Sequence, residues 1–311
     1  MQAQSSPYVC SLNAKLQEKA KNELNEIPAR REKDIQSLKD MVNAHPGLKC
    51  PTDNAFLLKF LRARKFNLDR TYDLILSYFT LKAENPDVFG DFLPSKCEHV
   101  MQEKVIMALP NRDSEGRRML YFRAGKWDPE KFSERQLIKL NVMQLEVVLK
   151  DEDTQVNGIV LIGDFTGITM KHVATIEREK KPLMPTIVQD AFPIRVKRFH
   201  ICNQPAIFSA AWAIISPFMK EKLRSRISFH GNDLKKLQDE VGPENLPEEL
   251  GGKLGPADKV AEAWYKNIRG EEKYFTDHLD YKIELTKPIT KKKNEDVVDS
   301  LMGTYKKLNV D

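Results

Sequence analysis

Residues 192–226 read FPIRVKRFHICNQPAIFSAAWAIISPFMKEKLRSR, and from Phe199 to Met219 this stretch contains no Asp, Glu, Lys or Arg. A transmembrane helix requires roughly 20 uninterrupted, mainly apolar residues, whereas Asn203-Gln204-Pro205 and Ser216-Pro217 interrupt this stretch. Ser at the N-cap and Pro at the first helical position commonly begin a helix. We therefore expect three elements here: a strand at 198–202, a short apolar helix at 205–215 and a basic helix that begins at Ser216.

The expected middle helix is apolar nearly all round, and both of its flanks are basic. Its apolar side chains are Ile207, Phe208, Trp212, Ile214 and Ile215. The flanking basic side chains are Arg195, Lys197, Arg198, Lys220, Lys222, Arg224 and Arg226. A helix that is apolar on every side is either buried in the core or packs against another apolar molecule. Composition alone favours the core, because most buried helices serve packing only.

The rest of the chain is helical at first and then alternates strands with helices. Apolar residues recur at helical spacing between residues 12 and 86, which predicts a small α-helical subdomain. Further on, Ser133-Glu-Arg-Gln136 matches a capping box for a helix with two apolar sides. Ile159–Ile162 is a continuous apolar run, typical of a strand covered on both faces. With strands also expected at 118–124 and 227–230, the order predicts an α/β domain with a largely parallel sheet.

The composition is that of a globular protein, with 41% hydrophobic and 31% charged residues. The formal net charge of +5 suits an anionic membrane surface but is too balanced to indicate nucleic acid binding. The first ten residues show no charged segment followed by an apolar one, so no signal peptide is expected. Four cysteines lie far apart without a CxxC pair, which favours free thiols. We therefore expect a cytoplasmic protein.

Motifs of catalysis and of cofactor binding are missing from the sequence. No GxGxxG follows a strand, and no GxxxxGK[ST], GxSxG or HExxH occurs. The six histidines are isolated from each other and from cysteine, so neither a metal nor a cofactor is expected. Asp164 follows a buried strand, where α/β enzymes place catalytic groups, but a single carboxylate is more typical of a structural turn. An enzyme that uses Asp164 is therefore a rival hypothesis, and we expect a protein that is not an enzyme.

Several segments, taken together and in collinear order, match the pattern of one family. They are FLLKFLRARKFNLDRT (56–71), WDPEKF (127–132), DTQVNGIVLIGDFTGI (153–168), AFPIRVKRFHICNQPAIF (191–208), SRISFHGNDLKKL (225–237) and LPEELGG (246–252). This set resembles the CRAL-TRIO lipid-transfer family, closest to the branch of α-tocopherol transfer protein and cellular retinaldehyde-binding protein. The resemblance implies a helical N-terminal subdomain (1–95), a CRAL-TRIO lipid-binding domain (96–255) and a C-terminal tail (256–311). It also implies a mobile helical lid at roughly 203–226 over one hydrophobic ligand.

The resemblance further implies the residues of two binding sites. The expected pocket residues are Ile138, Asn141, Val142, Leu145, Ile162, Phe165, Leu183, Ile187, Val188, Phe192, Ile194, Phe199, Phe208 and Trp212. In the tocopherol and retinaldehyde branch a basic groove binds phosphoinositide headgroups, and the matching positions here are Arg64, Arg195, Lys197, Lys222 and Arg226. Two lining positions that hold serine in the tocopherol protein are Asn141 and Leu145 here, which changes the polar group that would orient a ligand's hydroxyl.

The spacing of the basic residues indicates how they are arranged around the lid. Arg195 and Lys197 are two apart, so they project to the same side of an extended chain. Lys222 and Arg226 are four apart, so they would share one face of a helix. The two pairs bracket the expected lid, so a headgroup held between them would bias the position of the lid.

We interpret the chain as a carrier of a single tocopherol-, retinoid- or other terpenoid-like molecule that it transfers at phosphoinositide-containing membranes. The expected partners are this ligand, phosphoinositide headgroups and, transiently, a membrane surface, with no nucleic acid and a monomeric state. An alternative is a phosphatidylinositol or other phospholipid transfer protein, which a polar cavity mouth would favour. A further rival is an interaction module whose apolar stretch docks a protein, in which case no internal cavity should exist.

Overall fold

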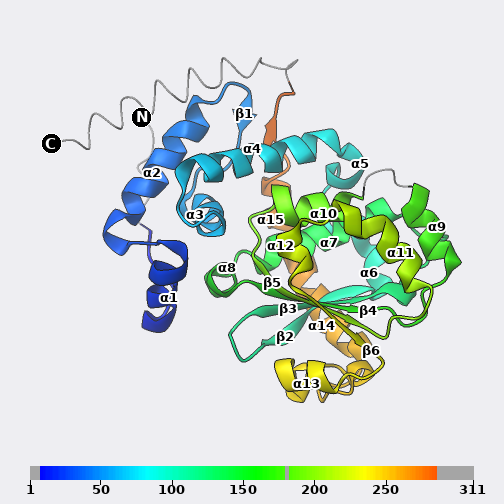
Figure 1. Cartoon of the computed structure of the whole chain (residues 1–311). Helices are drawn as coiled ribbons and strands as arrows, with labels where there is room; N and C mark the ends of the chain where they lie inside the picture. The colour runs from blue at the N-terminus through cyan, green and yellow to red at the C-terminus, as the bar shows by residue number, and fades with distance from the viewer. Residues whose placement is uncertain (1–7, 179–181, 286–311) are drawn as a thin grey trace.

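A five-stranded sheet forms the centre of the computed structural model, which describes residues 8–178 and 182–285 (Figure 1). The strands are β2 (Ile106–Arg112), β3 (Arg118–Arg123), β4 (Ile159–Asp164), β5 (Val196–Cys202) and β6 (Ile227–Gly231), and they lie side by side in this order. β2 and β3 are antiparallel, and each following pair of neighbours is parallel. The predicted α/β class with a mostly parallel sheet is confirmed.

The sequence pattern did not predict β2, and Pro110 is the reason. Proline lacks the N–H that a central strand needs, so it interrupts a strand pattern and is tolerated mainly on edge strands. β2 is an edge strand, and its register with β3 shifts between Ala108 and Arg112, on either side of the proline.

Helices cover the sheet on both faces. On one face lie α7 (Glu134–Val148), α9 (Met170–Arg178), α10 (Leu183–Thr186), a π-helical turn η3 (Ile187–Ala191) and α11 (Phe208–Ile215), whereas α13 (Lys235–Val241) lies on the other (Figure 1). α7 begins with the predicted capping box between Ser133 and Gln136. Along β5, Phe199 and Ile201 face the first set of helices and His200 faces α13, as the alternation of a strand requires.

The predicted N-terminal helical region precedes the sheet. Its helices are α1 (Ala14–Leu24), α2 (Pro28–Ala44), α3 (Asn54–Ala63), α4 (Leu68–Glu84) and α5 (Pro86–Phe89). A buried polar contact joins this region to α7: the Lys59 Nζ lies 3.0 Å from a carboxylate oxygen of Glu146, and the Tyr78 hydroxyl donates to the other oxygen. All three side chains are buried, so removing one member of the charge pair would leave the other buried without a partner.

Two helices follow residue 255, where a tail was expected: α14 (Ala257–Gly270) and α15 (Glu272–Asp277). The Tyr265 hydroxyl of α14 donates to the Ile106 carbonyl, so α14 packs along β2. The shorter elements are β1 (Leu48–Lys49), η1 (Pro94–Cys97), α6 (Glu98–Gln102), η2 (Ala124–Lys126), α8 (Glu152–Asn157), η4 (Ser216–Phe218), α12 (Glu221–Arg224), η5 (Pro243–Asn245), η6 (Glu248–Leu250) and β7 (Lys282–Ile283). Residues 286–311 of the expected tail lie outside the described residues, and the domain boundaries at 95 and 255 stay a prediction.

The prediction of a continuous basic helix from Ser216 is wrong. Ser216–Phe218 forms a 3₁₀ turn without a side-chain capping bond, Met219 is extended, and α12 begins only at Glu221. The break turns the Met219 side chain inward, where it is buried in the apolar interior. Arg226 follows the end of α12, so it does not share a helical face with Lys222 as expected.

Candidate functional site

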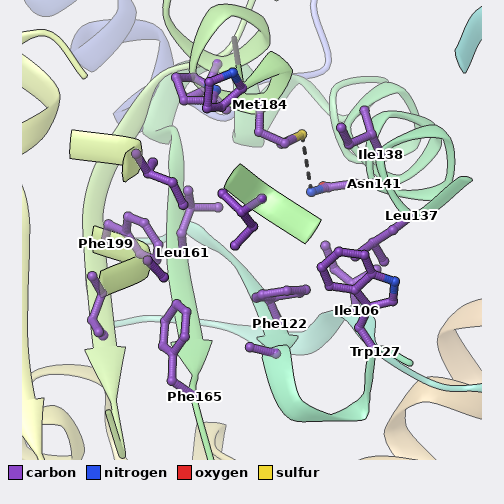
Figure 2. A pocket seen from close by; sticks show the side chains of 18 of the residues that line it. Ile106, Phe122, Trp127, Leu137, Ile138, Asn141, Leu161, Phe165, Met184 and Phe199 are labelled. Carbon is purple, nitrogen blue, oxygen red and sulfur yellow. Dashed lines mark hydrogen bonds between the residues drawn. The ribbon is translucent and has the colours of Figure 1, made fainter. Parts of the chain in front are cut away.

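An apolar cavity of ≈ 280 Å³ lies between the sheet and helices α7, α9, α10 and α11. In Figure 2, Phe122 and Leu161 of the sheet, with Phe165 after β4, lie across the cavity from Ile138 and Asn141 of α7. Small-molecule sites in proteins usually enclose about 300–1,000 Å³, so the cavity is close to the lower end of that range. Its presence disfavours the interaction module, for which no internal cavity was expected.

Ten of the fourteen predicted pocket residues line this cavity: Ile138, Asn141, Leu145, Ile162, Phe165, Val188, Ile194, Phe199, Phe208 and Trp212. The other four, Val142, Leu183, Ile187 and Phe192, are buried in the core and are not part of the lining. On α7 the spacing explains the division, because Ile138, Asn141 and Leu145 share one side of the helix and Val142 points elsewhere. The Phe192 ring packs instead against Tyr78 of α4, at 5.0 Å between centroids. Contact of the ten with a ligand stays a prediction.

Sequence reasoning missed part of the lining. The missed residues include Ile106, Leu120, Phe122, Trp127, Leu137, Leu161, Met184, Ile201, Ala211, Ile215, Met219 and Leu223. Leu120 and Phe122 are two apart in a predicted strand, so the alternation of that strand was a usable signal. Met219 carried no such signal, because its inward position depends on the break between η4 and α12.

Three polar side chains line the cavity among the described residues: Glu134, Asn141 and His172. The His172 Nδ1 accepts the Thr169 N–H at 3.0 Å, and its Nε2 lies 2.8 Å from the Trp127 carbonyl, to which it donates. The Asn141 amide nitrogen lies 3.7 Å from the Met184 sulfur (Figure 2), and a thioether is only a weak acceptor. Asn141 therefore offers the cavity a polar group that a ligand could engage at little cost.

The predicted lid has one side toward the cavity and one toward solvent. Phe208, Trp212 and Ile215 of α11 face inward and line the cavity. On the outer side Ala213 is exposed, and so is Phe218, at 39% of its surface. α11 is therefore neither wholly buried nor an ordinary amphipathic helix, since its solvent-facing side holds Ala210 and Ala213 and only one polar residue, Ser209.

Gln189 of η3, in the cavity wall, forms hydrogen bonds with the part of the lid that follows α11. Its side-chain amide donates to the Phe218 carbonyl at 3.0 Å, and its oxygen accepts the Lys220 N–H. Beside it, the Lys220 ammonium pairs with Asp190. The extended Met219 is thus held between two backbone hydrogen bonds to one side chain.

The basic residues that were expected to form a groove lie in two neighbouring groups. In the first group, the Arg195 Nη2 and the Lys197 Nζ lie 3.3 and 3.2 Å from the same carboxylate oxygen of Glu23. The prediction that Arg195 and Lys197 project to one side is confirmed by this shared partner. Arg226 lies next to them and donates to the Val196 carbonyl.

The second group contains Arg64 and Lys222, together with Lys65 and Arg70, which were not predicted. Burial lowers the pKa of Lys222, and the charges of Arg226, Lys65, Arg70 and Arg64 lower it further. Mutual repulsion of this kind shows that the side chains gather at one place on the surface. Binding of a headgroup by these residues is not tested by the structure and stays a prediction.

Asp164 has a structural role at the end of β4. Its Oδ1 accepts the Thr166 N–H and the Asn203 amide, each at 3.0 Å, and its Oδ2 accepts the Tyr121 hydroxyl at 3.0 Å. The carboxylate is buried, and both of its oxygens are engaged in holding the turn. The geometry gives no support to an enzyme that uses Asp164.

The prediction that all histidines are isolated is wrong for one pair. The His200 Nδ1 lies 2.9 Å from the His230 Nε2 across neighbouring strands. Burial, and then the charge of His230, lowers the pKa of His200 to about 4. No group of three or more potential metal ligands occurs within residues 8–178 and 182–285.

None of the described helices combines the length and apolar character that crossing a membrane requires.

The family model of the CRAL/TRIO domain matches residues 102–252, and that of the Pinta-like UBA domain matches residues 27–97. Alpha-tocopherol transfer protein-like from Mus musculus is 38% identical over 269 residues, which are 86% of this chain and 78% of that protein. Clavesin-2 from Rattus norvegicus is 35% identical over 270 residues, 86% of this chain and 81% of clavesin-2. Clavesin-1 from Xenopus laevis is 35% identical over 276 residues, 87% of this chain and 81% of clavesin-1.

Proposed function

This chain belongs to the CRAL/TRIO family, and on that premise we propose that it carries one tocopherol-, retinoid- or other terpenoid-like molecule and transfers it at phosphoinositide-containing membranes. The observation that carries the proposal is the cavity of ≈ 280 Å³, whose described lining is apolar apart from three polar side chains. Such a lining accepts a ligand that is apolar along most of its length. A phospholipid also brings a charged headgroup, whose burial without partners is costly, so phospholipid transfer is the less supported alternative.

Asn141 would orient the polar end of the ligand. Among the described residues its amide contacts the Met184 sulfur, a weak acceptor, so a hydroxyl or carbonyl of the ligand would form a better hydrogen bond with it. A net intramolecular hydrogen bond contributes about 0.5–1.5 kcal/mol, which selects the orientation of a ligand rather than providing most of its affinity. Most of the affinity would come from burial of apolar surface.

The lid would serve both cargo retention and contact with the membrane. With Trp212 and Ile215 facing the cavity and Phe218 exposed, the same segment can close over the cargo or place its outer side in a bilayer interface. Each Lys or Arg near an anionic membrane contributes about 1 kcal/mol, so the basic residues beside the lid would hold the protein there transiently. We propose that the protein acts in the cytoplasm without covalent chemistry, since Asp164 is committed to a turn.

The first experiment is native mass spectrometry of the purified protein, followed by extraction and identification of the bound lipid. We expect one molecule of a lipophilic compound without phosphorus per chain. A bound phospholipid would support the alternative carrier function, and a protein that neither retains nor takes up any lipid would contradict both.

The second experiment tests the membrane step with the double variant Arg195→Ala and Lys222→Ala. Loss of two cations at about 1 kcal/mol each predicts roughly thirty-fold weaker binding to phosphoinositide vesicles, slower cargo transfer and unchanged cargo binding in solution. The matched control replaces Lys235 of α13 and Lys266 of α14, two exposed lysines outside the groove, with alanine. If the two double variants transfer cargo to phosphoinositide vesicles at equal rates, net charge explains the binding and the groove does not.

A further inference from the structure

Glu23 of α1 occupies the centre of the first group of basic residues. One of its carboxylate oxygens lies 3.3 Å from the Arg195 Nη2 and 3.2 Å from the Lys197 Nζ. Arg195 lies just before β5 and Lys197 lies on it, 172 and 174 residues further along the chain from Glu23. A phosphate oxygen held by the same two side chains would accept charge-assisted hydrogen bonds in the same geometry.

The position is one in which an anion is needed. Burial lowers the pKa of Arg195, and the nearby charge of Arg226 lowers it further. Burial also lowers the pKa of Lys197, with further contributions from Arg195 and Lys19. Cations that are partly dehydrated and repel each other gain from a negative partner, and Glu23 supplies it.

Glu23 responds to these cations in the expected way. Burial would raise the pKa of its carboxyl group, but the charges of Lys197 and Lys19 and the hydrogen bonds from Lys197 and Arg195 outweigh burial and lower it. The carboxylate is therefore ionised at neutral pH. Its side chain keeps 40% of its surface exposed, so it can leave the two cations by rotating toward solvent.

Within residues 8–178 and 182–285, no carboxylate forms an ion pair with Arg64 or Lys222 of the second group. Arg64 and Lys222 each feel the repulsion of Arg70, and Lys222 that of Lys65 as well. Asp190 is the one carboxylate that acts on Arg64 among the described residues, and it is paired with Lys220. Among the described residues the two groups are thus unequal: an incoming anion meets a competing carboxylate at Arg195 but no ion-paired carboxylate at Lys222.

We propose that Glu23 is a built-in counter-ion that occupies a phosphate position between Arg195 and Lys197, and that a headgroup phosphate must displace it to bind there. The inference rests on the proposed function, because it concerns the same basic groove. Glu23 thereby makes α1 a part of the headgroup site and lowers the affinity of the site for phosphate.

The test compares Glu23→Gln with Glu18→Gln, a matched change of charge on the same helix. Glu18 is exposed and forms no ion pair within the described part of the chain. The unaltered full-length chain and both full-length variants are titrated with phosphatidylcholine vesicles that contain phosphatidylinositol bisphosphate, and separately with soluble inositol trisphosphate. A partly exposed ion pair changes an equilibrium constant by up to about five-fold. We therefore expect Glu23→Gln to bind both probes about three- to five-fold more tightly than the unaltered chain does. The affinity of Glu18→Gln should be nearly unchanged.

Equal gains for both variants would overturn the proposal, because the effect would then come from net charge alone. A gain for Glu23→Gln with vesicles but not with inositol trisphosphate would also overturn it, since direct competition does not require a bilayer. If the unaltered chain binds both probes and Glu23→Gln gains nothing, the counter-ion role is wrong and the proposed function stands. If no form binds either probe, the phosphoinositide site itself is refuted, and the counter-ion role with it.

Discussion

Replacing Val188 with tryptophan is expected to close the cavity to a ligand without unfolding the protein. Val188 belongs to η3 and lines the cavity, whereas its neighbour Ile187 is fully buried and does not. A buried aromatic side chain covers about 150–250 Å², so the change adds on the order of 100 Å² of apolar surface inside the cavity. At about 25 cal/mol per Å², that area amounts to ~2.5 kcal/mol that a ligand no longer gains.

The expected result is roughly seventy-fold weaker ligand binding, because every 1.4 kcal/mol is a factor of ten in the dissociation constant. The unliganded protein should lose little stability: an empty cavity of ≈ 280 Å³ costs as much as about 7 kcal/mol at ~24 cal/mol per Å³, and the indole fills part of it. The measurements are a fluorescence titration with a fluorescent tocopherol analogue and with retinol, and a thermal melt of the same preparations.

Ile187→Val is the matched control for this substitution. It removes one buried methylene group next to Val188, so it should cost about 0.5–1.5 kcal/mol of stability and leave affinity unchanged. If Val188→Trp melts like the unaltered chain and still binds ligand within about three-fold of it, the ligand does not occupy this cavity and the assignment of the site is wrong.

Two further predictions concern buried charge. His200 has a folded-state pKa of about 4, below its usual 6.5, so the unfolded chain binds more protons between these values. The free energy of unfolding should therefore fall by about 3 kcal/mol as pH drops from 6.5 to 4. Denaturation of His200→Gln at several pH values should show a flatter dependence on pH, whereas equal slopes for the two proteins would contradict the assignment. Glu146→Gln leaves the buried ammonium of Lys59 without its charged partner at 3.0 Å, which should lower the free energy of unfolding in urea by about 3–5 kcal/mol. The double variant Lys59→Met with Glu146→Met should recover most of that loss. A loss below about 1 kcal/mol for Glu146→Gln would show that this pair does not join α3 to α7.

Much of the fold could be predicted from the sequence because its signals are local. The capping box at Ser133 and the apolar run at Ile159–Ile162 depend on neighbouring residues, and the structure contains both elements. The resemblance to the CRAL-TRIO family, carried by several ordered segments, is confirmed by relatives 35–38% identical to most of the chain. Local signals failed where tertiary packing overrides them. The helix expected from Ser216 breaks so that Met219 can be buried, and the edge strand around Pro110 lacked a strand pattern.

The sequence alone determined the α/β class, most of the central strands and the kinds of side chain available for an apolar cavity and a basic groove. The tertiary structure decided which of those side chains meet. Leu145 lines the cavity and Val142 does not, because the packing of α7 sets which side of the helix faces the sheet. Glu23 contacts both Arg195 and Lys197 because α1 packs against α3 and α8, which brings its carboxylate to the start of β5. Contacts of this kind follow from the docking of distant elements, and no spacing along the chain encodes them.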